Sequence, residues 1–182
     1  MLYQRSTVYM LATMAGPGTT GWYSAALRAV EASKTGHLAA FGALYPALAQ
    51  TDTVAATPAR WRPTITASLT ALLLVAAAAA VALTLVADPL VPLLYGPGFA
   101  PAIAALRILG WVLVPYTISA YLSLAFVAMR REWPVARALA ASVVALVVLG
   151  AWWIPREGLL GACWATLAAE TLQAAVLVAH WR

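Results

Sequence analysis

Four long stretches of this chain are almost free of charged side chains, and this feature limits what the chain can fold into. They are residues 64–87, 102–129, 138–154 and 159–179, and the only charged residues within them are Arg107 and Glu170. A bilayer core is crossed by about 20 apolar helical residues, with a range of about 17–25. We therefore predict four membrane-spanning helices.

Composition supports lipid as the solvent for much of the chain. Of its 182 residues, 64% are hydrophobic and 9% are charged, whereas a soluble domain has about 25% charged residues. The net charge of +5 would otherwise suggest nucleic acid, but the basic residues sit in short connections and form no basic patch. We therefore expect membrane lipids and not nucleic acid as partners. The single cysteine, Cys163, excludes an internal disulfide.

Two further helices are expected at the N-terminal end. Residues 21–50 form a helix that carries Arg28, Glu31, Lys34 and His37, so it must face other helices or a wet cavity. Residues 1–15 are helical but reach only about 20 Å, against a core about 30 Å thick. We therefore expect this segment to be the last part of a longer spanning helix in a larger parent protein.

The predicted fold is an all-α multi-pass bundle of about six helices that fills residues 1–182. Pro115 is expected to kink its helix without ending it, because apolar sequence continues on both sides. Basic residues gather in alternate connections, in 52–63, in 130–137 and at the C-terminus, whereas 16–20 and 88–101 have none and 155–158 has only Arg156. The positive-inside rule then predicts a cytoplasmic C-terminus.

No motif of a soluble enzyme is present, and we expect neither catalytic residues nor a metal or cofactor. Ionisable residues inside the spans are the informative ones. Thr166, Glu170 and Gln173 share a helical face with Cys163. A carboxylate in such a stripe is typical of a hydrogen bond between two helices or of a transport or coupling role.

The cations leave two interpretations open. Arg107 lies near a helix end, so it either reaches the headgroups or stands at the mouth of a cavity. Arg28 and Glu31 are three residues apart, so they either neutralise each other or line a cavity. Arg5 lies in the short first helix, where its depth is open.

Three stretches resemble the C-terminal half of a known family. These are GWYSAALRAVEASKTGHLAAFGALYPALAQ, LVPLLYGPGFAPAIAALRILGW and IPREGLLGACWATLAAETLQ. They resemble polysaccharide flippases of the multidrug/oligosaccharidyl-lipid/polysaccharide exporter superfamily. Within them, residues 94–109 match L-Y/F-G-x-x-F-x-x-A-x-x-x-L-R-I-L, and residues 154–166 match I-P-x-x-G-x-x-G-A-x-x-A-T.

The resemblance implies one lobe of a two-lobe transporter in the plasma (inner) membrane. It implies alternating access around a cavity and lipid-linked oligosaccharide as the substrate, with a missing N-terminal lobe or partner chain supplying the other half. It places Arg5, Arg28, Glu31 and Arg107 on or near the cavity, where arginines suit an anionic pyrophosphate linkage. It also makes Glu170 a structural or coupling residue.

Two other functions stay open. A drug/cation antiporter of the same fold would need acidic cavity groups, and cations outnumber carboxylates in the predicted helices. A membrane-embedded enzyme or subunit of polysaccharide assembly usually needs a sizeable extramembrane loop, and the longest connection here is about a dozen residues.

Overall fold

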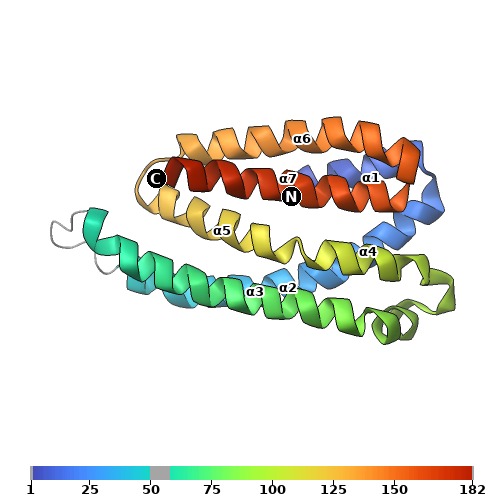
Figure 1. Cartoon of the computed structure of the whole chain (residues 1–182), viewed down its shortest axis with the longest axis horizontal. Coiled ribbons are helices and arrows are strands. Elements are labelled where there is room, and N and C mark those ends of the chain that lie inside the picture. Colours follow the sequence, from blue (N-terminus) through green and yellow to red (C-terminus); the bar gives the residue numbers. More distant parts are fainter. Residues whose placement is uncertain (1, 50–57, 182) are drawn as a thin grey trace.

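The predicted all-α bundle is confirmed by a computed structural model of the chain, which describes residues 2–49 and 58–181, with side chains at 6–34 and 66–181. All regular structure in these residues is helical (Figure 1). The elements are α1 (Leu2–Met14), α2 (Pro17–Ala49), α3 (Pro58–Tyr95), the short 3₁₀ turn η2 (Pro97–Phe99), α4 (Pro101–Gly110), α5 (Leu113–Ala128), α6 (Trp133–Glu157) and α7 (Leu159–Trp181).

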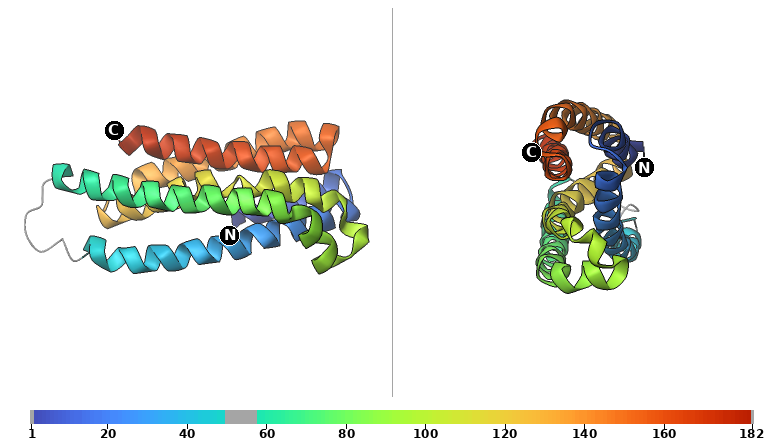
Figure 2. Two further views of the ribbon diagram at one scale, coloured as in Figure 1. Left: turned by 60° about the horizontal axis from the view of Figure 1, so that its bottom comes forward. Right: turned by 90° about the vertical axis from the view of Figure 1, so that its right-hand side faces the viewer.

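The helices run roughly along one long axis and turn at its two ends (Figure 1). The turn before α6 and the C-terminal end of α7 lie at one end, and the turns before α2, α4 and α7 lie at the other. Viewed along the axis, α1 and α2 lie on the side of the bundle opposite to α3 and α7 (Figure 2). This arrangement gives the bundle two distinct broad faces.

Four stretches of helix are long and apolar enough to cross a membrane. They are Thr66–Tyr95, Pro101–Ala128, Trp133–Glu157 and Leu159–Trp181. Their exposed surfaces are apolar, as the open positions of Leu85, Val144 and Val148 illustrate. An apolar surface of this extent is stable against lipid chains and not against water. The protein is therefore membrane-embedded, and each of the four predicted spans corresponds to a helical stretch of the required length and composition.

The expected connection at 88–101 is wrong in its first half, because α3 continues to Tyr95. Ala87 and Val91 are one turn apart and both are buried in the main core. The burial of this face holds the backbone helical past Pro89 and Pro92, although each proline removes a backbone hydrogen bond. Asp88 is therefore a helix residue and not a loop residue.

The other helix ends also lie outside their expected positions. α2 begins at Pro17, and α6 runs from Trp133 through Pro155 to Glu157. Pro17 and Pro134 occupy first turns, where a missing N–H costs little. Arg60 and Arg62 belong to the start of α3, and Arg137 belongs to α6, so these basic residues lie at helix ends.

The expectation that Pro115 kinks its helix without ending it is wrong, because the segment is divided into two helices just before the proline. The helix is interrupted between α4 and α5 at Trp111 and Val112, one turn before the proline. Pro115 has no N–H for the carbonyl of Trp111, which instead accepts a bond of 3.3 Å from the N–H of Val114. The interruption turns α5 so that it packs against α3 and α7, whereas α4 packs mainly against α2 and α3.

The closest helix pair is α6 and α7, which are joined by Gly158 alone. Gly158 has a φ of 56°, a conformation that glycine adopts without strain. Gly161 lies so near the α6 backbone that a Cβ at this position would collide with the carbonyl of Trp153. Small residues at the contact let the two backbones approach, as is typical of packed membrane helices.

Candidate functional site

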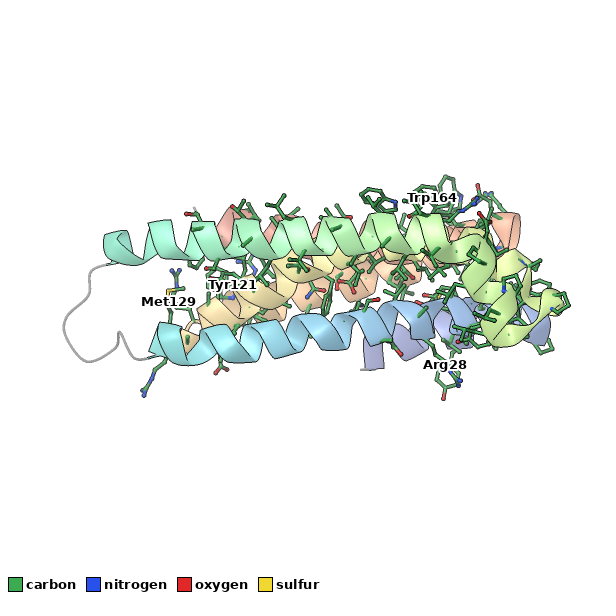
Figure 3. All side chains as sticks on the ribbon, turned by 90° about the horizontal axis from the view of Figure 1, so that it is seen from below. Arg28, Tyr121, Met129 and Trp164 are labelled. Atoms are coloured by element: carbon green, nitrogen blue, oxygen red, sulfur yellow. The ribbon has the colours of Figure 1, made fainter. Side chains whose placement is uncertain are left out.

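One face of α2 carries its packing, and exposed charges lie beside that face. Tyr23, Leu27 and Val30 follow each other at four- and three-residue spacing and are buried in the main core. Arg28 and Glu31 point elsewhere and are exposed. Figure 3 shows Arg28 projecting from α2 on the side away from α3. These two predicted site residues are thus together on one open surface of the bundle.

The position of Arg28 along α2 makes its exposure significant. Arg28 lies 11 residues after Pro17, where α2 begins, which corresponds to about 16 Å along a helix. Trp22, six residues before Arg28, donates a hydrogen bond from its indole N–H to the carbonyl of Gly98 in the turn before α4, so Arg28 lies within two turns of that end of the bundle. A charged side chain is costly where it faces hydrocarbon, and a long one near a helix end can reach the headgroups. The Arg28–Glu31 face is therefore compatible with headgroups, with water or with a second protein surface.

Lys34 continues the buried face of α2 into the bundle interior. It is four residues beyond Val30 and only 6% exposed. Its ammonium Nζ lies over the Tyr116 ring of α5, 4.2 Å from the ring centre. A cation held against an aromatic face away from water gains about 2 kcal/mol. Glu31, three residues before Lys34 on α2, also interacts electrostatically with Lys34, so the buried contact and the exposed Glu31 are neighbours on the helix.

Glu170 enters the same interior region from α7. It is 5% exposed and interacts electrostatically with Lys34 and with Tyr116. A buried carboxylate is stabilised when a cation lies nearby, since each ion alone would be costly in a low-dielectric interior. We refer to Lys34, Tyr116 and Glu170 as the interior charge cluster, which joins α2, α5 and α7.

A hydroxyl pair lies one turn from Glu170 on α7. The hydroxyls of Tyr23 and Thr166 are hydrogen-bonded at 2.9 Å, and Thr166 also donates to the carbonyl of Ala162. Since Thr166 uses its proton in that bond, Tyr23 is the donor to Thr166. Thr166 therefore fastens α7 to α2, and its stripe with Glu170 faces the bundle interior.

Gln173, the third member of the predicted stripe, makes a different contact. Its carbonyl Oε1 accepts a hydrogen bond of 3.1 Å from the hydroxyl of Ser142 on α6. This bond connects α6 and α7, the pair that already packs most closely. Gln173 therefore has a helix-joining contact that is separate from the interior charge cluster.

Arg107 is brought to α3 and not to the Arg28–Glu31 face. Its guanidinium donates to the carboxylate of Asp88 at 2.5 Å, and both side chains are about half exposed, at 47% and 59%. Sequence reasoning missed this pair because it placed Asp88 in a loop. The arginine therefore has an anionic partner within the chain, on the α3 side of α4.

Arg5 belongs to α1, but its side chain lies outside the described residues.

Lys34 and Tyr116 were not predicted as site residues. The sequence pattern could have identified Lys34, because it lies on the same helical face as Tyr23, Leu27 and Val30. Its charge, which is usual on exposed faces, concealed that periodicity.

A shallow groove of about 580 Å³ lies between α5 and α7. Its walls are apolar and include Trp111, Val114, Ile118, Leu167, Ala174 and Val178. Thr171 is the one residue of this lining with a polar side chain, so the groove suits hydrocarbon better than a sugar or a phosphate. Among the side chains that the structure describes, at 6–34 and 66–181, no three histidine, cysteine or acidic residues lie together as a metal site would require.

Comparison with known proteins gives no relative: no family model, curated protein or solved structure matches the chain.

Proposed function

We propose that this chain is one lobe of a two-lobe transporter that flips lipid-linked oligosaccharides across the plasma (inner) membrane. The observation that carries the proposal is the exposed pair of charges, Arg28 and Glu31, on α2 of a membrane-embedded bundle. Charges in such a position are compatible with a water-filled cavity between this lobe and another protein surface. No covalent chemistry is required, because the lipid tail stays in the bilayer while the head group crosses.

The cationic member of this face suits the proposed cargo. A polyprenyl-pyrophosphate linkage is anionic, and the planar guanidinium of Arg28 can bind two of its oxygens at once. Arg5 on α1 would add a second cation to the cavity. Arg107 would contribute only after leaving Asp88, so its part in binding is secondary. Glu170 would serve as a structural or coupling residue behind the cavity wall.

The basic residues set the proposed orientation. Arg130 and Arg131 lie in the turn before α6, at the same end of the bundle as the C-terminal end of α7. At the opposite end the basic Arg156 is followed directly by the acidic Glu157. Positive charge accumulates on the cytoplasmic side of membrane proteins, which supports the proposal that the C-terminus is cytoplasmic.

A drug/cation antiporter of the same fold is the second candidate. It would need carboxylates on the open face, and there Glu31 stands beside Arg28 while Glu170 is buried behind α2.

A membrane-embedded assembly enzyme or subunit is the third candidate. The turns before α2, α6 and α7 are only a few residues long, which leaves little room for a catalytic loop.

The test is a flipping assay in liposomes reconstituted from solubilised membranes that contain the chain together with the second lobe that the proposal requires. The liposomes contain a polyprenyl-pyrophosphate oligosaccharide labelled on its sugar, and an impermeant reagent quenches only outer-leaflet label. With the chain present, we expect quenching to extend to inner-leaflet label. Arg28→Ala should slow this phase roughly tenfold or more, because a charge-assisted contact contributes about 1.5–3 kcal/mol.

The matched control is Arg156→Ala, which removes an exposed arginine from the end of α6. This variant should flip at the wild-type rate. Equal rates for Arg28→Ala and wild type would refute the cavity role of Arg28. Uptake of a cationic dye without any oligosaccharide flipping would favour the antiporter.

A further inference from the structure

The exposed side of α6 carries a tryptophan near each end and apolar residues between them. Trp133 and Trp152 are 72% and 55% exposed, and Val144 and Val148 lie open between them. The two tryptophans are 19 residues apart, which is about 28 Å along a helix. A bilayer core is about 30 Å thick, and tryptophans gather at both of its interfaces. The spacing therefore indicates that Trp133 marks one interface and Trp152 marks the other.

Arg137 is the only charged residue between these tryptophans, and it lies on the exposed side of α6. It follows Trp133 by one turn and precedes Val144 by two turns, so the three share one side of the helix. The opposite side is buried against the bundle, at Pro134, Ala138, Ser142 and Leu146. Arg137 is about 6 Å inside the level of Trp133, and a long basic side chain reaches the headgroups from there. Its guanidinium is therefore presented to lipid headgroups.

Two more arginines are exposed in the turn directly before α6. The N–H of Arg131 donates to the carbonyl of Phe126 at 2.8 Å, and the N–H of Arg130 donates to that of Val127 at 2.9 Å. This pair of bonds closes a helix on a left-handed residue, which is usually glycine. Here Arg130 takes that position, with a φ of 54°. The turn therefore has a fixed backbone and exposes both arginines at the end of the bundle where α6 begins.

We propose that Arg130, Arg131 and Arg137 bind the phosphate of an anionic phospholipid whose acyl chains lie along Val144 and Val148. A guanidinium donates two parallel hydrogen bonds to phosphate oxygens, which makes arginine well suited to this ligand. The two valines give the acyl chains an open apolar surface that continues from the headgroup level into the core. We call these five residues the α6 lipid site. The inference goes beyond the proposed function and does not depend on it.

The charge balance at this end of α6 favours a lipid with a net negative charge. Within residues 130–137, three arginines outnumber the one acidic residue, Glu132. A zwitterionic headgroup carries its own cation, which the arginines repel, whereas phosphatidylglycerol carries a negative phosphate and no cation. Each arginine near an anionic membrane surface contributes about a fivefold gain in binding. The α6 lipid site should therefore prefer phosphatidylglycerol to phosphatidylcholine.

The experiment inserts the full chain in vesicles of phosphatidylcholine and phosphatidylglycerol, with brominated acyl chains on one lipid or on the other. Bromine quenches the fluorescence of tryptophans that lie close to it. Each form of the chain is measured with Trp133 and as its Trp133→Phe counterpart, and the difference isolates the emission of Trp133. In the wild type, brominated phosphatidylglycerol should quench Trp133 at a lower membrane fraction than brominated phosphatidylcholine.

The arginine variants test which side chains give this preference. Arg137→Gln should lower the binding of phosphatidylglycerol relative to phosphatidylcholine about fivefold, and Arg130→Gln combined with Arg131→Gln should lower it at least as much. Arg156→Gln is the matched control, because it removes an exposed arginine from the other end of α6 and should leave the preference unchanged. A wild-type preference in Arg137→Gln, or equal quenching by both lipids in the wild type, overturns the inference.

Two further outcomes separate a phospholipid from other occupants. Inorganic phosphate, added at constant ionic strength, should not displace phosphatidylglycerol from Trp133. Displacement would assign the arginines to a soluble phosphate and would overturn the inference. Absence of quenching by either brominated lipid would mean that a protein surface covers this side of α6, and it would also overturn the inference. Circular dichroism confirms that each variant keeps its helix content.

Discussion

The ammonium of Lys34 lies 4.2 Å from the centre of the Tyr116 ring, so α2 meets α5 through a buried cation on an aromatic face. Glu170 of α7 supplies the opposing charge. The three helices are thus held together by groups that are individually costly inside a membrane protein. Their mutual stabilisation makes the cluster cooperative, and its members should not be replaceable one at a time.

Replacement of Lys34 by Met should destabilise the fold by about 3–5 kcal/mol, because Glu170 would remain buried beside no compensating ammonium. The double variant Lys34→Met with Glu170→Leu should recover most of that loss. Unfolding in mixed micelles, followed by circular dichroism, measures both. A double variant less stable than Lys34→Met alone would show that the two charges do not act as a pair.

Tyr116 provides a finer probe of the same cluster. Tyr116→Phe keeps the aromatic face and should change stability little, whereas Tyr116→Leu should lose about 1–2 kcal/mol of cation–π attraction. The same unfolding measurement compares them. If Phe and Leu cost the same, the ring is not what holds Lys34.

Gly161 tests the close contact between α6 and α7. A methyl group at this position would meet the backbone carbonyl of Trp153, which cannot move aside as a flexible side chain can. Gly161→Ala should therefore cost about 1–3 kcal/mol. Gly18→Ala, in the first turn of α2 where nothing lies within 4 Å, is the matched control. Equal unfolding midpoints would contradict the tight contact.

The pair between Arg107 and Asp88 should contribute little to stability despite its short distance. Both side chains are about half exposed, and exposed ion pairs are typically worth less than about 1 kcal/mol. Asp88→Asn and Arg107→Gln should each unfold within about 1 kcal/mol of wild type. A loss of several kcal/mol would mean that the pair is shielded in the membrane.

The spans were predictable because long uncharged apolar runs admit few structures in a chain with so little charge. The helix ends were harder to predict. A proline in the sequence suggests a break in a helix, and whether the helix continues past it depends on the packing of its neighbours. Ala87 and Val91 contact the core and carry α3 past Pro89. That contact depends on which helices are neighbours, and the hydrophobic pattern does not contain this information.

In the candidate site, too, contacts within one helix were predictable and contacts between helices were not. Local spacing placed Arg28 beside Glu31 and Thr166 beside Glu170, because each pair lies within one turn of one helix. It could not find the ion pair between Asp88 and Arg107, which joins two helices. Lys34 was missed for another reason, since a lysine on a buried helical face contradicts the usual rule that long charged side chains lie outside.

The single residue between α6 and α7 has a consequence for motion. The link is too short to let the two helices separate, and the backbones already meet at Gly161, which leaves no clearance between them. Any alternating-access cycle must carry α6 and α7 as one rigid body. Hinge movement is then left to longer or weaker joints, such as Gly16 between α1 and α2, with its φ of 87°, and the interruption at Trp111 and Val112.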